Sequence, residues 1–558
     1  MLTLSVNGLP LDLGADVSIS WELRSPVFSA LGSRSYPFRL PGTPKNRKIL
    51  GYRHRVEGSA SIYDELPCVI RFNNIDLFWG LMKFKVANLS QYEVIIYEGT
   101  GDFAYATQNK LLSDINYGDY SFASAQAGVD YVNHTMYDLL PQYWGYPNFL
   151  RAYPMIGNEV YFDPPAVHDE LTYYNYRLQS PYYLSLFADY PDPEPNRIIV
   201  PMVFFRHVLN TVISSLGYAF TDLVFTAHAD FNKLLIYNSL SNNNHCPDFT
   251  YSMDKTFLNL HLPRITLKEF LESIEQMFNC RFFISSLDHR VTLRGLDSIV
   301  SSSAGSIPWN RGLLSKSIEP DEPVKGFLLE QSLDSSDAHL SEWIARGDQY
   351  KSFTRAPVDT VGELPAFPLS IPGDIRYCAS TSKFYRFSIS KTWVEDPLIR
   401  QFQIGRYYYK NFTDSRPIAL SSLKPGISYQ GSVPMTDCGN ALKEYNDIKF
   451  RLLFLSSYAI SGTSPTRYMP VGTDRTDNYN LWMQGANNMF DKFHKKTCDF
   501  SMATEMVRLQ RVMNLEELRD FDFTASYLVD SLKYLVRRLQ LTLKRDRISP
   551  CSIECMRL

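Results

Sequence analysis

The sequence predicts an α+β protein in which β-structure dominates: several small β-barrel or β-sandwich domains with short helices packed on them. The chain has 558 residues, which is too many for one hydrophobic core. Aromatic residues make up 14% of it, with 36 Tyr and 35 Phe, and it has 32 Pro. Tyr-rich chains interrupted by proline favour strands and surface loops over helix bundles. Its 45% hydrophobic and 21% charged residues are typical of a folded, soluble protein.

The N-terminus predicts a β-hairpin. Leu2, Leu4 and Val6 alternate along "LTLSV", and Asn7-Gly8 is a strong turn signal. The segment lacks a basic region followed by a continuous apolar stretch, so we do not expect a signal peptide. No run of 18 apolar residues occurs, and none of the eight cysteines forms a CxxC pair. We therefore expect reduced, structural thiols in a protein that folds in a reducing cytoplasm.

Residues 33–55, "SRSYPFRLPGTPKNRKILGYRHR", contain seven Lys or Arg and no acidic residue. "YPFRLP" predicts a strand that ends at Pro41, and Thr43 and Pro44 suit the N-cap and first position of a helix. That helix has two turns at most, with Gly51 after its end. It is a solvated surface element, a polyanion-binding site or a protein–protein contact. The candidate interface residues are Lys45, Arg47, Lys48, Arg53 and Arg55.

Composition and hydrophobic patterning divide the chain into six parts. We expect a β-rich domain at 1–119, a Tyr-rich insertion at 120–200, a helix-plus-sheet domain at 201–297, a Ser-rich linker at 298–312, a β-rich domain at 313–478 and an α+β segment at 479–558. The first domain contains three predicted strands, "LPCVIRF", "IDLFWGLMKFKVA" and "QYEVIIYEG". The tyrosines of the insertion suit a glycan-binding surface, a protein interface or local packing.

The third part contains an internal repeat. "FFRHVLNTVISSLGYAF" and "TLKEFLESIEQMFNCRFFI" match at a shift of 62 residues, and each pairs an amphipathic helix with a short aromatic strand. Gly217 and Asn279, two residue types that accept a left-handed helix end, follow the helices. We expect the stripe of each helix to be buried against a sheet. The stripes are Phe205, Val208, Leu209, Val212 and Leu216, and Leu267, Phe270, Leu271, Ile274 and Phe278.

Catalytic motifs are absent from the sequence. It has no GxGxxG, no P-loop, no GxSxG and no HExxH. Asp189, Asp192 and Glu194 lie on a proline-stiffened loop whose oxygens could hold calcium, but a solvated loop is the favoured interpretation. We expect no enzymatic activity, no cofactor and no resident metal.

Four segments, in this order, resemble the tail hub (baseplate hub or tail-associated) proteins of tailed bacteriophages of Bacteroidetes. The first is the opening hairpin followed by "SYPFRLPGTPKNRKILGYRHR", and the second is "ITLKEFLESIEQMFNCRFFI". The third is "GELPAF" with "GDIRYCASTSKFYRF" and Trp393. The fourth runs from "NYNLWMQGANNMFDKF" through "NLEELRDFDF" to the end. Together they cover about half of the chain, and the Tyr-rich insertion has no counterpart in the family.

The resemblance implies a structural virion protein without catalysis. Such hubs form a ring around the tail axis, join the tail tube to the tip and close the channel that holds the tape measure and later DNA. The expected partners are distal tail or tube proteins, the tape measure protein and tail fibres, with non-specific passage of DNA and no membrane insertion. Assembly would take place in the host bacterial cytoplasm. We expect a homotrimer, because exposed strand edges need covering.

Two other classes compete with the tail hub. A glycan-binding adhesin or receptor-binding surface protein would explain the aromatic excess, but such proteins normally need an export signal. A polysaccharide hydrolase of a tailspike needs two carboxylates flanking a groove, and the sequence offers no way to pair them. In the hub interpretation the basic residues of 33–55 face a neighbouring subunit or the lumen.

Overall fold

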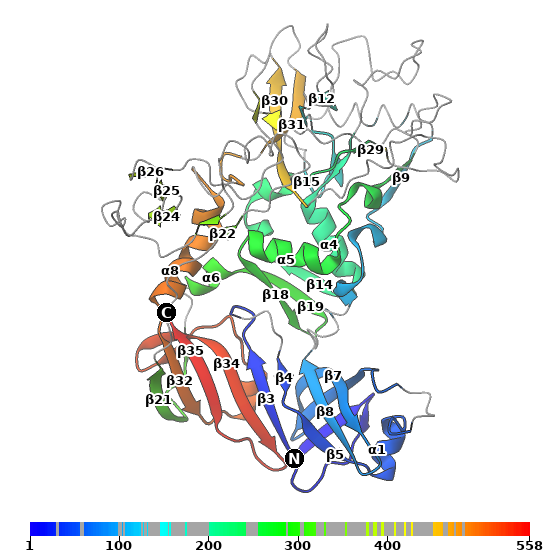
Figure 1. Ribbon diagram of the computed structural model, residues 1–558, viewed down its shortest axis with the longest axis vertical. Helices are drawn as coiled ribbons and strands as arrows, with labels where there is room; N and C mark the ends of the chain where they lie inside the picture. Colours follow the sequence, from blue (N-terminus) through cyan, green and yellow to red (C-terminus); the bar gives the residue numbers. More distant parts are fainter. Residues whose placement is uncertain are drawn as a thin grey trace.

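The computed structural model (Figure 1) has a β-rich base and, above it, a part that contains the longer helices. The described residues are 1–28, 33–55, 61–98, 106–123, 145–154, 200–241, 255–285, 288–301, 306–319, 450–460, 467–473, 476–481 and 486–558, with short pieces elsewhere. In Figure 1, strands from both ends of the chain lie side by side at the base, and helices α4 (Phe205–Ser215) and α5 (Leu267–Met277) lie above them.

The base is one sheet of 14 strands, in the order β2-β1-β6-β7-β8-β4-β3-β34-β35-β32-β21, with β5, β20 and β33 off this path. Its N-terminal strands are β1 Leu2–Val6, β2 Leu9–Pro10, β3 Ser18–Arg24, β4 Arg34–Ser35, β5 Phe38–Pro41, β6 Leu66–Phe72, β7 Ile75–Ala87 and β8 Gln91–Glu98. Its later strands are β20 Ile307–Pro308, β21 Leu313–Glu319, β32 Met506–Arg511, β33 Tyr527–Val529, β34 Leu532–Lys544 and β35 Cys551–Arg557.

The predicted opening hairpin is confirmed. Strands β1 and β2 pair antiparallel around Asn7 and Gly8, whose φ angles of 49° and 77° are those of a tight hairpin turn. Leu2, Leu4 and Val6 have exposed fractions of 2%, 0% and 0%. The alternation read from the sequence therefore marks the face that is buried in the sheet's core.

The two ends of the chain meet where β3 pairs with β34. Residues 18–24 run antiparallel to residues 544–538, and Trp21, fully buried, stacks on Phe78 with ring centroids 4.6 Å apart. Leu539, Leu541 and Leu543 are buried in the same core. The C-terminal segment is thus an integral part of the N-terminal sheet. The expected domain boundaries at 119 and 479 remain predictions.

The sheet curls without closing. The amide of Leu2 donates to the carbonyl of Arg545, which brings the start of β1 to the end of β34, yet the strand order keeps two ends, at β2 and β21. The α+β, β-dominated and multidomain class is confirmed. Among the described strands, however, none of the sheets forms a closed barrel, because no strand pairing joins the two ends.

The predicted helix–strand repeat is also confirmed. Helix α4 leads to β14 (Ala219–Asp222), and α5 leads to β18 (Cys280–Ser285). Both strands pair with β19 (Arg290–Gly295), which lies between them. Gly217 and Asn279 end the helices with φ angles of 82° and 44°. Of the two stripes, nine residues are buried in one shared core and Leu216 packs against it: Phe205, Val208, Leu209, Val212, Leu267, Phe270, Leu271, Ile274 and Phe278.

Helices lie at the start of the Ser-rich spacer and in the C-terminal segment. The Ser-rich spacer opens as helix α6 (Leu296–Val300), whose Ile299 packs with Val27 and Leu535 of the base. The sequence "NYNLWMQGANNMFDKFHKK" at 478–496 predicts an amphipathic helix through Leu481, Met489 and Phe493. The helix begins later, as a π-helical turn at Phe490–His494, and continues as α8 (Lys495–Ala503). Asn487 has a positive φ of 56°, and the side chain of Asn488 accepts from the amide of Asp491 at 2.7 Å, so a cap forms there.

Most of the remaining described strands are short, and the longest, β30, has nine residues. They are β9 Asp119–Ser121, β10 Arg151–Ala152, β11 Ile156–Gly157, β12 Tyr173–Tyr174, β13 Met202–Val203, β15 Leu234–Ile236, β16 Leu240–Ser241, β17 Lys255–Phe257, β22 Leu329–Glu330, β23 Ser352–Phe353, β24 Ile375–Cys378, β25 Lys383–Phe387, β26 Trp393–Glu395, β27 Tyr407–Tyr408, β28 Ile418–Ala419, β29 Gly426–Ile427, β30 Leu452–Ile460 and β31 Arg467–Thr473. Helix α1 (Pro44–Ile49) and helix α9 (Leu515–Arg519) belong to the base.

Several expectations lie outside the described residues. Most of the Tyr-rich insertion at 120–195 does, including Asp189, Asp192 and Glu194, and so does most of 320–449. Within the part of the chain that is described, none of the helices has the length and apolar character needed to cross a membrane. Cys68, Cys280, Cys498, Cys551 and Cys555 are free and buried.

Candidate interface

The basic segment forms the local structure that its sequence predicts. The hydroxyl of Thr43 accepts from the amide of Asn46 at 3.1 Å and caps α1, and Pro44 occupies its first turn. Gly51 follows the helix with a φ of 73°. Arg47 and Lys48 lie in the last turn, where the helix dipole favours positive charge. The helix has six residues, which is too short to enter a groove of duplex DNA in the usual way.

A buried amide fixes this helix to the sheet. Asn46 is fully buried; its amide nitrogen donates to the carbonyls of Asp12 and Pro41, and its oxygen accepts from the amide of Asp12 at 2.8 Å. Lys45 forms an ion pair with the Asp12 carboxylate at 3.1 Å. The hydrogen bond from Thr43, followed by that from Lys45, lowers the pKa of Asp12. Lys45 is therefore engaged within the chain, although it remains exposed.

Two of the candidate arginines are also held internally. The Nε of Arg47 donates to the carbonyl of Gly42 at 2.9 Å. Arg53 is 9% exposed, donates to the carbonyl of Leu50, pairs with Asp64 at 3.3 Å and lies over the ring of Phe84. Burial lowers the pKa of Arg53, against the opposing charge of Asp64. Arg53 is thus a packing residue and is not displayed to a partner.

The cations that remain available form a smaller set. Lys48 and Arg55 are exposed, as are Arg34 on β4 and Arg39 on β5. Arg55 lies over the ring of Tyr52 at 4.9 Å; none of the four has an ion-pair partner among the described residues. The structure therefore narrows the displayed part of the predicted interface to Lys48 and Arg55, and adds Arg34 and Arg39.

A second polar surface was not foreseen. It is a row of charges across the outer face of the β3-β34-β35-β32 sheet, which we call the charge ladder: Arg24, Glu22, Arg538, Glu554 and Arg508. Glu22, only 1% exposed, is 3.0 Å from Arg24 and 3.2 Å from Arg538. Burial alone would raise the pKa of Glu554, but the hydrogen bonds and charges of Arg538 and Arg508 outweigh it, and the pKa is lowered.

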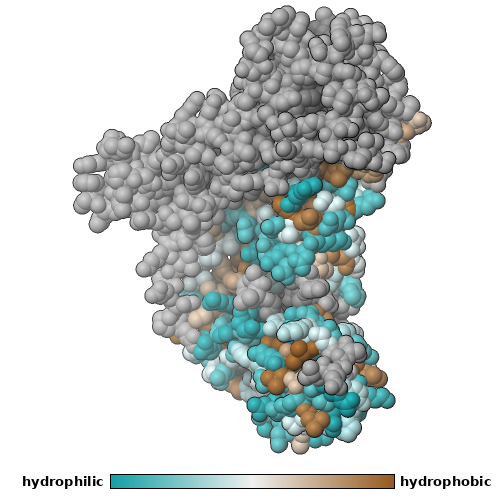
Figure 2. Space-filling view, turned by 45° about the vertical axis from the view of Figure 1, so that its right-hand side comes forward, coloured by the Kyte–Doolittle hydropathy of each residue, from teal (hydrophilic) through white to brown (hydrophobic). Residues whose placement is uncertain are grey.

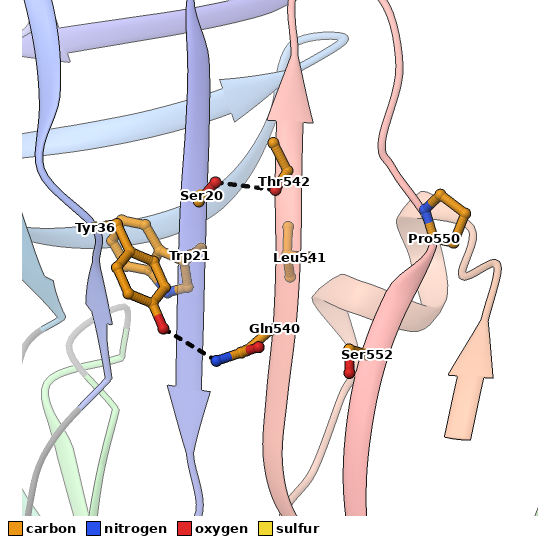
Figure 3. Close-up of a pocket in the computed structure, with 8 residues that line it drawn as sticks. All are labelled: Ser20, Trp21, Tyr36, Gln540, Leu541, Thr542, Pro550 and Ser552. Carbon is orange, nitrogen blue, oxygen red and sulfur yellow. Dashed lines mark hydrogen bonds between the residues drawn. The ribbon is translucent and has the colours of Figure 1, made fainter. Parts of the chain in front are cut away.

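Next to the charge ladder lies a shallow hollow of about 370 Å³. Figure 3 shows its lining residues on β3, on β34, at the start of β35 and, for Tyr36, directly after β4; the Gln540 amide donates a hydrogen bond to the Tyr36 hydroxyl. The hydroxyls of Ser20 and Thr542 are 3.0 Å apart across the β3–β34 pairing. The alternation of polar residues along β3 and β34 could have predicted this face, but their sequence separation hid that both strands share it.

These surfaces offer no recognisable reaction centre. Among the described residues, groups of three or more His, Cys, Asp or Glu that could hold a metal are absent. The charge ladder consists of ion pairs that satisfy one another, and the hollow is lined by hydroxyls, an amide and an aromatic ring. The charge ladder, whose Glu22 and Glu554 are buried, stabilises the sheet, and the hollow is the surface that suits contact with another macromolecule.

Comparisons with known proteins give little. No protein-family model matches the sequence, and no curated protein is similar to it. One solved structure to which the chain is similar is the prophage MuSo2 43 kDa tail protein from Shewanella oneidensis, with 9% sequence identity, coverage of 100% of this chain and 95% of that chain, and a TM-score of 0.30. At this identity and score the likeness carries no argument about function.

Proposed function

We propose that the chain is a structural, non-enzymatic protein of a bacteriophage tail: a hub at the tail tip or baseplate that joins the tail tube to the tip and closes the channel around the tape measure. The observation that carries this proposal is the order of the four segments that resemble tail hubs. The Bacteroidetes affiliation rests on the same resemblance.

The local structure of three of these segments supports the proposal. The opening hairpin is followed by strand β5 and the short basic helix α1. Helix α5 leads into the aromatic strand β18. The last segment supplies α8, α9 and the four strands β32, β33, β34 and β35 of the base. Most of the third segment lies outside the described residues.

The proposed assembly is a homotrimer that contacts tube or distal tail proteins, the tape measure protein and tail fibres. It would be located in the virion, after assembly in the host cytoplasm, and would let DNA pass without reading its sequence. The displayed cations Arg34, Arg39, Lys48 and Arg55 could contact a neighbouring protein surface or face the channel through which DNA passes.

The direct test is to locate the chain in particles. We expect tails to contain it at three copies per particle by quantitative mass spectrometry, and to find cross-links from it to the tube and tape measure proteins. We also expect a phage that lacks the gene to produce heads without functional tails. Purified particles without the chain, or intact tails in the deletion strain, would overturn the proposal.

One observation favours the second candidate, a glycan-binding surface protein. Tyr36, 43% exposed, borders the hollow together with hydroxyl and amide groups, and an aromatic face with such groups can bind a sugar ring. The test is glycan binding by the wild type, by Tyr36→Ala and by the control Tyr63→Ala, which removes a 91% exposed tyrosine elsewhere. Binding lost only in Tyr36→Ala would favour this candidate; binding in none would dismiss it.

A further inference from the structure

The base contains an internal repeat at a shift of 457 residues. Hairpin β6–β7 turns at Asn73-Asn74 and hairpin β33–β34 turns at Asp530-Ser531, and all four turn residues have positive φ. Phe72 pairs with Ile75 in the first hairpin, and Val529 pairs with Leu532 in the second. The long strands β7 and β34 both have 13 residues.

The register of the following strand agrees as well. Leu81 pairs with Tyr97 and Met82 with Ile96 in the β7–β8 ladder. Their equivalents, Arg538 with Glu554 and Leu539 with Ile553, pair in the β34–β35 ladder. Each long strand carries one bulge in this ladder, at a different place: between Phe84 and Val86 on β7, and between Val536 and Arg538 on β34. A capped short helix precedes each unit, α1 after β5 and α9 after β32, and β5 and β32 pair with the last strand of their unit.

The two long strands differ along one edge. On β34, β33 covers Leu532–Tyr534 and β3 covers residues 538–544. On β7, β6 covers the edge as far as Met82. Residues 83–87 of β7 have, on that edge, no strand or backbone partner among the described residues. The equivalent of β3 is therefore missing from β7.

The equivalent of β3 is β21, at the far end of the sheet. In the first unit Glu22 pairs with Arg34, which pairs with Tyr97. In the second, Ser317 pairs with Arg508, which pairs with Glu554. Tyr97 and Glu554 are equivalent, so Ser317 occupies the place of Glu22. Strand β21 pairs only with β32 in the described part of the chain, which leaves its outer edge open.

Both open edges expose apolar side chains. Leu314 and Ile318 of β21 are 58% and 64% exposed. Val86 of β7 is 44% exposed, whereas its equivalent Leu543, on the strand that pairs with β3, is fully buried. Figure 2 shows hydrophobic patches that interrupt the hydrophilic surface of the base. The other end of the sheet is blunted, since β2 has two residues and ends at Pro10; proteins protect edges in this way. An open edge of seven residues is a template for pairing.

We propose that β21 of one copy of this chain adds antiparallel to residues 83–87 of β7 of the next copy, and so repeats between copies the joint that β3 and β34 form within one. The second copy is the fitting occupant because the chain carries both halves of the joint. The register of the internal joint places Ser317 opposite Lys83, since Glu22 pairs with Gln540. It also places Leu314 opposite Val86. The contact is head-to-tail, so it closes a ring or grows a filament; it rests on the proposed role in a tail assembly.

The first test is a disulfide between copies. Directly opposed residues of an antiparallel pair have Cα atoms about 4.5–5.5 Å apart, which suits a disulfide. We expect full-length Ser317→Cys/Lys83→Cys to form covalent multimers on mild oxidation. Five native cysteines are buried, and the wild type treated in the same way is the control for cross-links through Cys246, Cys378 or Cys438. The matched control Ser317→Cys/Trp79→Cys, whose β7 position is paired with Val69 of β6, should give at most symmetric dimers. Equal cross-linking in both double variants would overturn the pairing.

The second test uses two variants, each of which should assemble poorly on its own. Leu314→Lys and Val86→Asp each place a charge in the joint, at positions exposed in the single chain, so each variant should fold with an unchanged circular dichroism spectrum and assemble at least tenfold more weakly. A mixture should recover part of the assembly, because lysine on one copy meets aspartate on the next. If both variants assemble like the wild type, the joint is wrong while the tail proposal stands. A chain absent from phage tails that still cross-links would overturn the tail proposal alone.

Discussion

The two strand units of the base, residues 66–98 and 527–557, share their hairpin turn, ladder register and long central strand, but not the burial of that strand. "MKFKVA" in β7 and "LQLTLK" in β34 alternate apolar and polar residues in the same phase. Leu543 is nevertheless fully buried, while the equivalent Val86 is 44% exposed. Two features accompany the difference: β3 pairs with β34 and has no described counterpart on β7, and β7 has a bulge between Phe84 and Val86 that β34 lacks at the equivalent place. The alternation within a strand's own sequence does not specify either feature.

The largest effect on stability is expected in the helix–strand repeat, where the apolar stripes of both helices are buried in one core. Leu271→Asp places an unpaired charge in the core shared by α4 and α5, and Leu271 is 5% exposed. We expect a loss of about 4 kcal/mol in the free energy of unfolding, measured by urea denaturation. Lys268→Ala on the exposed side of α5, where the side chain of Lys268 is 50% exposed, is the control. Equal melting of Leu271→Asp and wild type would show that the stripe is not buried.

The next effect tests the two strand units directly. Leu543→Ala removes a fully buried side chain and should cost about 3 kcal/mol, whereas Val86→Ala at the equivalent place should cost less than about 1 kcal/mol in the isolated chain. Thermal melting at low protein concentration measures both. Similar losses in the two variants would mean that the edge of β7 is already covered within one chain.

The charge ladder gives a pH-dependent effect through Glu554 and its partners Arg538 on β34 and Arg508 on β32. The pKa of Glu554 is lowered from 4.5, so its ion pairs stabilise the fold above that value, and this contribution is lost as the pH falls through the lowered pKa. Glu554→Gln should lose about 2 kcal/mol at neutral pH and show a flatter loss of stability in acid. Glu516→Gln, at an exposed position of α9, should keep the wild-type acid profile. An unchanged profile in Glu554→Gln would contradict the coupling.

The smallest effect on stability concerns α1. Replacing Lys45, Arg47 and Lys48 together by Ala should cost less than about 1 kcal/mol, because the pair of Lys45 with Asp12 is solvent-exposed. Assembly with neighbouring tail proteins should weaken, with Lys48→Ala contributing more than Lys45→Ala. Binding to arbitrary duplexes should be weak, salt-sensitive and independent of sequence. Tight binding of one duplex at physiological salt, lost in the triple variant, would contradict the interface and the tail-hub class.

Local patterns predicted most elements of the base and of the helix–strand repeat. The hairpin at Asn7-Gly8, the helix capped by Thr43 and the helix ends at Gly217 and Asn279 all depend on residues within a few positions of one another. The start of the helix that leads into α8 was predicted too early, because Asn487 and Asn488 form a turn and cap that a stripe of apolar residues does not reveal. Of the candidate interface, Lys48 and Arg55 are displayed, whereas Arg53 is buried by Phe84 and Asp64.

The sequence by itself determined the class of fold, the phase of each amphipathic element and the turns, because these follow from side-chain alternation, caps and backbone preferences over short stretches. Only the tertiary structure decided that the two chain ends share one sheet, that Arg538 bridges Glu22 and Glu554 in the charge ladder, and that β21 and the end of β7 are left open among the described residues. Each of these depends on strand pairs that are hundreds of residues apart. Many strands of similar alternation could pair equally well, and only packing around one core selects among them.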